Sequence, residues 1–207
     1  MIDVHCLVHK KEEKFFPLLA EQMENEDNVN FHVIPNGDNI GRGRARGFLT
    51  GDAEYVSYVD YDDLIEPGIF TKINEVMNDG FPWCYTDEML IDEEGKDIQP
   101  GWSSNPELYN EYMLDFVAVG FNEHVHHILT FRRDILTPKI VYIMDQLKEL
   151  AEEYLRSELE GYHHKHIEEV GYYWRQHEDN SMKNYRAYRD IRRVMDDKGS
   201  HIIGSQV

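Results

Sequence analysis

Three carboxylates within four residues, at the end of one apolar segment, are the feature of this sequence best suited to chemistry. Asp60, Asp62 and Asp63 close the run VSYVDYDD. The apolar residues before them predict a strand over 54–60. Carboxylates crowded at the end of a strand repel one another unless a positive charge lies against them. A divalent cation that also binds phosphate oxygens meets this need, so the triplet predicts a site for a divalent metal ion.

The segment before this strand, NIGRGRARG, combines glycines with three arginines: Arg42, Arg44 and Arg46. A guanidinium binds phosphate oxygens through paired hydrogen bonds, and glycine lets a backbone approach a phosphate closely. We therefore predict a diphosphate-binding loop that leads into a helix over 44–50. The alternative is that these arginines only balance the acidic surface around them.

The order of three motifs resembles that of family-2-like glycosyltransferases with the GT-A fold. The first motif, N-x-G-x-x-x-A-R followed by D-x-D-D, matches residues 39–46 and 60–63. The second, YSDED followed by D-x-x-G-K, resembles YTDE at 85–88 and IDEEGK at 91–96. The third, H-I-P-x-x-L-Y-H-W-R-x-H, resembles HIEEVGYYWRQH at 166–177. The resemblance implies a metal-dependent, inverting transfer of a sugar from a nucleotide-diphosphate sugar to a hydroxyl acceptor.

The resemblance also implies roles for single residues. It assigns Asp60 to the nucleoside and the metal, and Asp62 to the metal itself, which it implies is Mn²⁺ or Mg²⁺. It places His177 near the metal or the diphosphate, where a neutral imidazole is a suitable ligand. The end of the second strand often carries an acidic pair in this family, but here it reads PNGD, so the nucleobase stays open. The remaining predicted donor-binding residues are Asp38, Asn39, Arg42 and Arg46.

The group that takes the proton of the acceptor is less well marked. Transfer to a hydroxyl needs a general base unless the leaving diphosphate accepts the proton. The usual carboxylate motif is absent, so Asp145 is one candidate base and the pair Glu152 and Glu153 is another. All three could instead be ordinary exposed helix charges. Asp87 and Glu88, which follow a short predicted strand, are predicted to face the sugar or the acceptor.

Strands and helices alternate along the chain. This order predicts a single α/β domain with a Rossmann-type, mostly parallel sheet and helices on both of its faces. Ligands of such sheets bind beyond the carboxyl ends of the strands, which is where the aspartate triplet falls. Residues 86–125 predict an irregular segment of the kind that forms lids or binding surfaces. The predicted strands cover 2–8, 29–34, 54–60, 83–85 and 167–170, and the predicted helices cover 14–26, 44–50, 66–78 and 139–159.

Composition limits the class of protein. A chain of 207 residues with 41% hydrophobic residues suits one folded domain. No apolar run reaches the length of a membrane span, which is roughly 18 residues. Cys6 and Cys84 each lie in an apolar run, which favours reduced core thiols and a cytoplasmic setting.

The net charge of −19 falls mainly on residues 1–138, and such an acidic body disfavours non-specific binding to nucleic acid. We divide the chain into a glycosyltransferase domain at 1–182 and a basic C-terminal helix and tail at 183–207. The basic helix either neutralises nearby acidic surface or contacts a phosphate-bearing partner. Its cations are Lys183, Arg186, Arg189, Arg192 and Arg193.

Two acceptors and one other class of function stay open at this stage. The acceptor hydroxyl belongs either to a glycan or to a hydroxymethylated pyrimidine in DNA, as in small phage glycosyltransferases. If the acceptor is DNA, the target base would be flipped out of the duplex and the basic C-terminal helix would contact DNA phosphates. The other class is a nucleotide- or sugar-binding module that has the fold without catalysis. The sequence does not indicate an oligomeric state.

Overall fold

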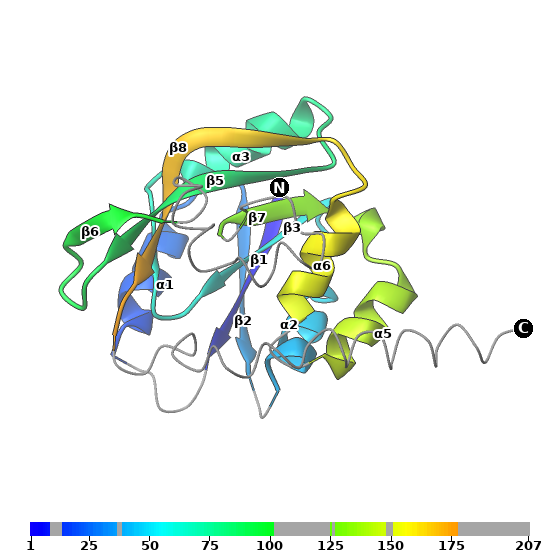
Figure 1. Cartoon of the computed structure of the whole chain (residues 1–207), viewed down its shortest axis with the longest axis horizontal. Coiled ribbons are helices and arrows are strands. Elements are labelled where there is room, and N and C mark those ends of the chain that lie inside the picture. The colour runs from blue at the N-terminus through cyan, green and yellow to red at the C-terminus, as the bar shows by residue number, and fades with distance from the viewer. Residues whose placement is uncertain (9–13, 37–38, 102–124, 126, 148–150, 178–207) are drawn as a thin grey trace, which may run out of the picture.

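One sheet of eight strands organises the part of the chain that the structure describes, as Figure 1 shows. The structure is a computed structural model, and it describes residues 1–8, 14–36, 39–101, 125, 127–147 and 151–177. The strands lie in the order β2-β1-β3-β7-β5-β8-β4, with β6 beside β5. Their bounds are Ile2–Val8 (β1), Val29–Pro35 (β2), Tyr55–Asp60 (β3), Leu64–Ile65 (β4), Trp83–Ile91 (β5), Asp97–Pro100 (β6), Leu129–Arg132 (β7) and His164–Arg175 (β8).

The sheet is mixed. β1 runs parallel to β2 and β3, and β5 runs parallel to β8. β7 lies antiparallel between β3 and β5, and the short strands β4 and β6 are antiparallel to β8 and β5. The predicted parallel pairing is therefore found among β1, β2 and β3 and between β5 and β8, and the antiparallel strand β7 separates these two groups.

The register of β7 decides which strand ends meet. Thr130 pairs with both Ser57 of β3 and Cys84 of β5. Because β7 runs against both neighbours, β3 and β5 point in the same direction, and their carboxyl ends reach the same edge of the sheet. Asp60, the last residue of β3, therefore lies at the same edge as the part of β5 that follows Tyr85.

Helices cover both faces of the sheet, as predicted. On one face α1 and α3 pack on Val4, Val59 and Cys84. On the other face α2, α5 and α6 pack on Val56 and Phe131. Consecutive residues of β3 alternate between these two cores, which is the period-two pattern of a strand buried on both sides. The helices are Phe16–Glu24 (α1), Ile40–Phe48 (α2), Ile69–Asn78 (α3), Pro138–Gln146 (α5) and Ala151–Leu159 (α6), with a 3₁₀ turn at Arg133–Ile135.

Several element boundaries differ from those predicted. The helix predicted over 139–159 is two helices, because α5 ends at Gln146 and α6 begins at Ala151. The helix predicted at 44 begins at Ile40, so the expected diphosphate-binding loop is helical. β5 and β8 extend well beyond 83–85 and 167–170. β4, β6 and β7 were not predicted, since strands of two to four residues give too short a period-two pattern.

Three other expectations concern the termini and the thiols. The basic helix predicted at 183–207 and residues 102–124 of the irregular segment predicted at 86–125 lie outside the described residues. The described start of that segment is not irregular, because it holds the end of β5 and all of β6. Cys6 and Cys84 are buried and form no disulfide, as predicted. In the described part of the chain no helix has both the length and the apolar character needed to cross a bilayer.

Candidate functional site

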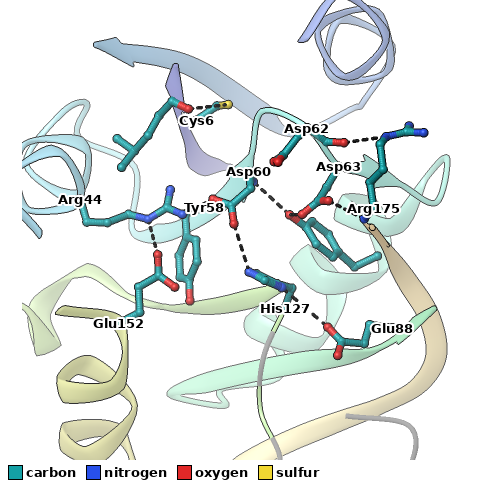
Figure 2. Close-up of polar contacts among 12 residues, drawn as sticks. Cys6, Arg44, Tyr58, Asp60, Asp62, Asp63, Glu88, His127, Glu152 and Arg175 are labelled. Atoms are coloured by element: carbon teal, nitrogen blue, oxygen red, sulfur yellow. Dashed lines mark hydrogen bonds and ion pairs between the residues drawn. The ribbon is translucent and has the colours of Figure 1, made fainter. Parts of the chain in front are cut away.

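Asp60 ends β3 at the carboxyl edge of the sheet and lies at the centre of the candidate site, as Figure 2 shows. Its Oδ1 accepts a hydrogen bond from Nη2 of Arg44, and its Oδ2 lies 3.4 Å from Nε2 of His127. Its backbone N–H donates to the hydroxyl of Tyr172 at 3.0 Å. Burial alone would raise the pKa of Asp60, but Arg44, helped by His127, holds it well below its usual range. Asp60 is therefore an ionised carboxylate that two protein cations already neutralise.

Arg44 reaches this carboxylate from α2, with only 2% of its side chain exposed. Its Nε donates to Oε1 of Glu152 at 2.6 Å, and its guanidinium carbon lies 4.4 Å from the centre of the Tyr58 ring. Burial opposes the charge, but Glu152 and Asp60 raise the pKa of Arg44 above its usual value. The sequence contains the signal for this position, because Arg44 lies one helical turn before Phe48 on the buried face of α2.

His127 connects Asp60 to a second carboxylate. Its Nδ1 lies 3.7 Å from Oε2 of Glu88, and its ring stacks on Tyr172 with 4.5 Å between ring centres. Burial would lower the pKa of His127, but Asp60 and Glu88 raise it to about 10. Glu88 is itself completely buried, and Gly101 packs directly against it. The structure thus places Glu88 against His127, and its predicted contact with sugar or acceptor stays a prediction.

Asp63 is a structural member of the triplet, and 1% of it is exposed. Its Oδ2 accepts a hydrogen bond from the hydroxyl of Tyr172 at 2.7 Å, and its Oδ1 accepts one from the backbone N–H of Arg175 at 2.7 Å. Burial, Asp62 and Asp60 all raise the pKa of Asp63 well above its usual value. Asp63 therefore fixes the end of β8 to the turn after β3.

Asp62 faces His177, the last residue that the structure describes. Its Oδ2 lies 2.7 Å from Nε2 of His177. The side chain of Arg175 fixes this arrangement, because its Nε donates to the backbone carbonyl of Asp62 at 2.8 Å and its Nη1 donates to that of Glu93 at 2.7 Å. Two of the predicted metal ligands, 115 residues apart in the sequence, are thus brought into contact.

The side chains at this edge that could bind a metal fit an ion whose remaining ligands come from water and a bound substrate. Among the described residues, no three His, Cys, Asp or Glu side chains are grouped so that they could hold a metal ion. Asp62 and His177 form a pair, whereas Arg44 and His127 already engage Asp60. Mg²⁺ in proteins often has only one or two carboxylate ligands and completes its shell with water and substrate phosphates. The pair suits that arrangement, with Asp60 outside it.

The start of α2 differs from the predicted phosphate loop. The side chain of Asn39 caps the helix by accepting a hydrogen bond from the backbone N–H of Arg42 at 3.1 Å. Arg46 donates to the backbone carbonyl of Pro35 at 3.0 Å, on the exposed side of the helix. The glycines serve packing, because a Cβ on Gly47 would lie less than 3 Å from the His5 ring of β1. Asp38 lies outside the described residues.

The predicted catalytic carboxylates Asp145 and Asp87 lie in different places. Asp145 is on α5, where its Oδ1 accepts a hydrogen bond from Nε of Arg42 at 3.1 Å. Asp87 lies on β5, with its Oδ1 2.7 Å from Nε2 of His166. The His166 ring stacks on Tyr85 at 4.5 Å and nearly parallel, at 9°. Asp87 is therefore held beside β8, and its predicted contact with sugar or acceptor stays a prediction.

The alternative carboxylate pair lies in the first turn of α6, beside Arg44. Glu152 bonds Arg44, and Arg44 holds the pKa of Glu152 below its usual value against the effect of burial. For Glu153 burial prevails over the opposing effect of Arg156 and raises the pKa to about 7. The Oε2 atom of Glu153 is buried and has no hydrogen-bond partner among the described residues. A carboxyl that titrates near neutrality is suited to accept and release a proton.

Comparisons with known proteins support the fold. No family model matches the chain, and no curated protein matches its sequence. Among solved structures, the chain is similar to S. aureus TarS 1-349, with a TM-score of 0.54 at 12% identity. The match covers 84% of this chain and 60% of that one, so the chain spans less than two thirds of the neighbour's length.

The chain is also similar to two structures of the same neighbour in complex with ligands. For TarS 1-349 in complex with UDP, the TM-score is 0.54 at 13% identity over 84% of this chain and 60% of that chain. For TarS 1-349 in complex with UDP-GlcNAc, the TM-score is 0.58 at 13% identity over 88% of this chain and 60% of that chain. At this identity the likeness establishes the GT-A-like fold.

Proposed function

We propose that this protein is a glycosyltransferase that uses a nucleotide-diphosphate sugar. The observation that carries the proposal is the carboxyl edge of the sheet, where Asp62 pairs with His177 and where Arg44 joins Asp60 to the start of α6. Ligands of α/β sheets bind at this edge. The structural neighbour TarS binds UDP and UDP-GlcNAc, which supports a donor of the same chemical class here.

Asp62 and His177 are the proposed metal ligands, and Asp60 is the proposed contact to the nucleoside. A bound Mn²⁺ or Mg²⁺ would supply positive charge to the diphosphate that leaves. Asp62 and His177 would hold the ion with one oxygen and one nitrogen. Asp60, kept ionised by Arg44 and His127, can accept hydrogen bonds from ribose hydroxyls. Asn39, Arg42, Arg46 and Asp38 stay candidates for further donor contacts.

Glu153 is the proposed general base, in preference to Asp145. The acceptor oxygen bonds to the anomeric carbon of the sugar, the bond from that carbon to the diphosphate breaks, and the acceptor proton passes to Glu153. A pKa of about 7 suits this proton transfer, and Glu153 lies next to Glu152, which Arg44 ties to Asp60. Asp145, half-exposed on α5, has Arg42 as its partner instead. Attack from the face opposite the diphosphate inverts the anomeric centre.

The donor reaction and its metal can be tested with one substitution. Purified protein is incubated with a set of nucleotide-diphosphate sugars and Mn²⁺, and release of the nucleotide diphosphate is measured. We expect metal-dependent release that Asp62→Ala lowers by roughly 100-fold or more, since an electrostatic contribution to charge stabilisation is lost. Asp134→Ala, in an exposed pair with Arg132, is the matched control and should keep wild-type release.

Two outcomes would change the proposal. Tight nucleotide binding without release or transfer in any mixture would favour a binding module over an enzyme. If Asp62→Ala releases the nucleotide diphosphate as fast as the wild type, Asp62 is not a ligand of the catalytic metal.

The acceptor is identified separately, by mass spectrometry of glycans and of nucleosides from hydroxymethylated DNA incubated with donor. Absence of any mass gain on the nucleosides, with donor release intact, would exclude the DNA acceptor.

A further inference from the structure

Arg44 joins two carboxylates that belong to different parts of the fold. Asp60 ends β3, and Glu152 lies in the first turn of α6. Both accept hydrogen bonds from the same guanidinium, one from Nη2 and one from Nε (Figure 2). The proposed donor contact and the helix that carries the proposed base are therefore connected through one side chain.

The surroundings of Arg44 hold its guanidinium in one plane. The Tyr58 ring lies 4.4 Å below it, and the Tyr58 hydroxyl accepts a hydrogen bond from Nη2 of Arg156 at 3.2 Å. Arg156 also lies 3.5 Å from Glu152 and 3.6 Å from Glu153. The first turn of α6 is thus fixed by two arginines at once. A planar guanidinium with several fixed donors can serve two carboxylates, whereas the single ammonium of lysine cannot hold this geometry.

We propose that Arg44 is a positioning residue, which places the first turn of α6, and with it Glu153, relative to Asp60. The inference rests on the proposed function, in which Asp60 contacts the donor and Glu153 accepts the proton. Arg44 acts on Glu153 through Glu152, the neighbouring residue of the same helical turn. It acts on the donor side directly, through Asp60. The hydrogen bond of Arg44 to Glu152 and its hydrogen bond to Asp60 therefore have effects that experiment can separate.

The link from Arg44 to Glu152 is tested by Glu152→Gln, which keeps the shape of the side chain and leaves Arg44 paired with Asp60. We expect kcat to fall roughly 10- to 100-fold, because a small displacement of a reacting group lowers the rate to that extent. The donor KM, and the affinity for UDP measured by calorimetry, should change less than about twofold. A residue that only stabilised the fold would lower the melting temperature without this split between kcat and KM.

The link from Arg44 to Asp60 is tested by Arg44→Gln and by the double variant Arg44→Gln with Glu152→Gln. Arg44→Gln should lower kcat as Glu152→Gln does, and should also weaken UDP binding by roughly 10-fold or more, since a buried charge loses its partner. In the double variant kcat should fall no further than in Arg44→Gln alone, because both changes break the same connection. Glu169→Gln, in an exposed pair with Lys72, is the control for loss of one carboxylate.

The outcomes distinguish this inference from the proposed function. If the wild-type protein transfers no sugar and releases no nucleotide diphosphate, the proposed function fails. If the wild type is active and folded Glu152→Gln keeps its kcat within twofold, only the positioning role of Arg44 fails. Additive losses of kcat in the double variant would also contradict it. If Arg44→Gln does not fold, Glu152→Gln alone decides, because that variant leaves the buried guanidinium with one carboxylate partner.

Discussion

At the scale of single residues, the burial of Glu153 is the property with the clearest consequence for activity. A base must be ionised to accept a proton, and burial raises the pKa of Glu153 to about 7. We therefore expect kcat to rise with pH through about 7 and to level off above it. Glu153→Gln should lower kcat by roughly 10²- to 10⁴-fold, the usual contribution of a general base, and should remove this limb of the profile. An unchanged profile would contradict the assignment.

The same shift predicts that Glu153→Gln stabilises the protein at neutral pH. A carboxyl whose pKa is higher in the folded than in the unfolded state loses stability as pH rises from its ordinary value of 4.5 towards about 7. The amide carries no such cost. The variant should therefore melt close to the wild type near pH 5 and above it at pH 8, as measured by thermal unfolding in both buffers. A lower melting temperature at pH 8 would mean that the ionised carboxylate has a stabilising role.

At the scale of elements, the glycines of α2 set how closely that helix lies on β1. Gly47→Ala would place a methyl group less than 3 Å from the buried ring of His5. We expect a loss of about 1–3 kcal/mol in the free energy of unfolding, as for other overpacked sites, measured by urea denaturation. Gly161, whose Cβ would meet nothing within 4 Å, provides the matched Gly161→Ala control. Equal stability of both variants would show that α2 can move away from β1 at no cost.

The same glycines show where sequence reasoning succeeds and fails for elements. Alternating apolar residues were enough to predict β1, β2 and β3, because each is a strand of at least six residues with a clear period. The glycines and arginines of α2 were interpreted as a loop, since composition alone does not distinguish a glycine needed for a phosphate from one needed for close packing. β7 was missed because its role depends on two partner strands that are distant in sequence.

For the site itself, the motif residues were easier to predict than their partners. Asp62 and His177 were expected near one another, and the structure places them in contact. Arg44 was predicted to bind a diphosphate and Glu152 was one of the candidate bases, but their ion pair was not predicted, because a buried pair between residues 108 apart leaves no local signal. His127 lies between Asp60 and Glu88. Contacts between elements that are distant along the chain, which the sequence does not specify, decided each of these positions.

At the scale of the whole molecule, a second buried charge cluster lies at the opposite end of β1. Asp3 has 2% of its side chain exposed and accepts hydrogen bonds from Asn30 and from the backbone N–H of Ala53, at 2.9 and 2.8 Å. It also pairs with His32 and Arg133. Burial opposes the ionisation of Asp3, but these hydrogen bonds hold its pKa below its usual value. This cluster ties together β1, β2 and the loop before β3.

Stability and catalysis should therefore be separable by position along β1. Arg133→Met leaves the Asp3 carboxylate without its main cation, and a buried pair broken on one side costs about 3–5 kcal/mol. We expect that loss in chemical denaturation, with the donor KM unchanged in the folded protein. Arg132→Met breaks an exposed pair with Asp134 and should cost less than about 1 kcal/mol. A change in donor KM for Arg133→Met would show that the two ends of the sheet communicate.

The place of β8 in the sheet has a consequence for how the protein is made. β8, His164–Arg175, lies between β5 and β4, and among the described strands β4 pairs with β8. Its last residue supplies the backbone N–H that holds Asp63, and His177 follows two residues later. A nascent chain released from the ribosome only as far as α6 would thus carry the aspartate triplet without the strand that arranges it. Donor binding should appear during synthesis only after residue 177 has left the exit tunnel.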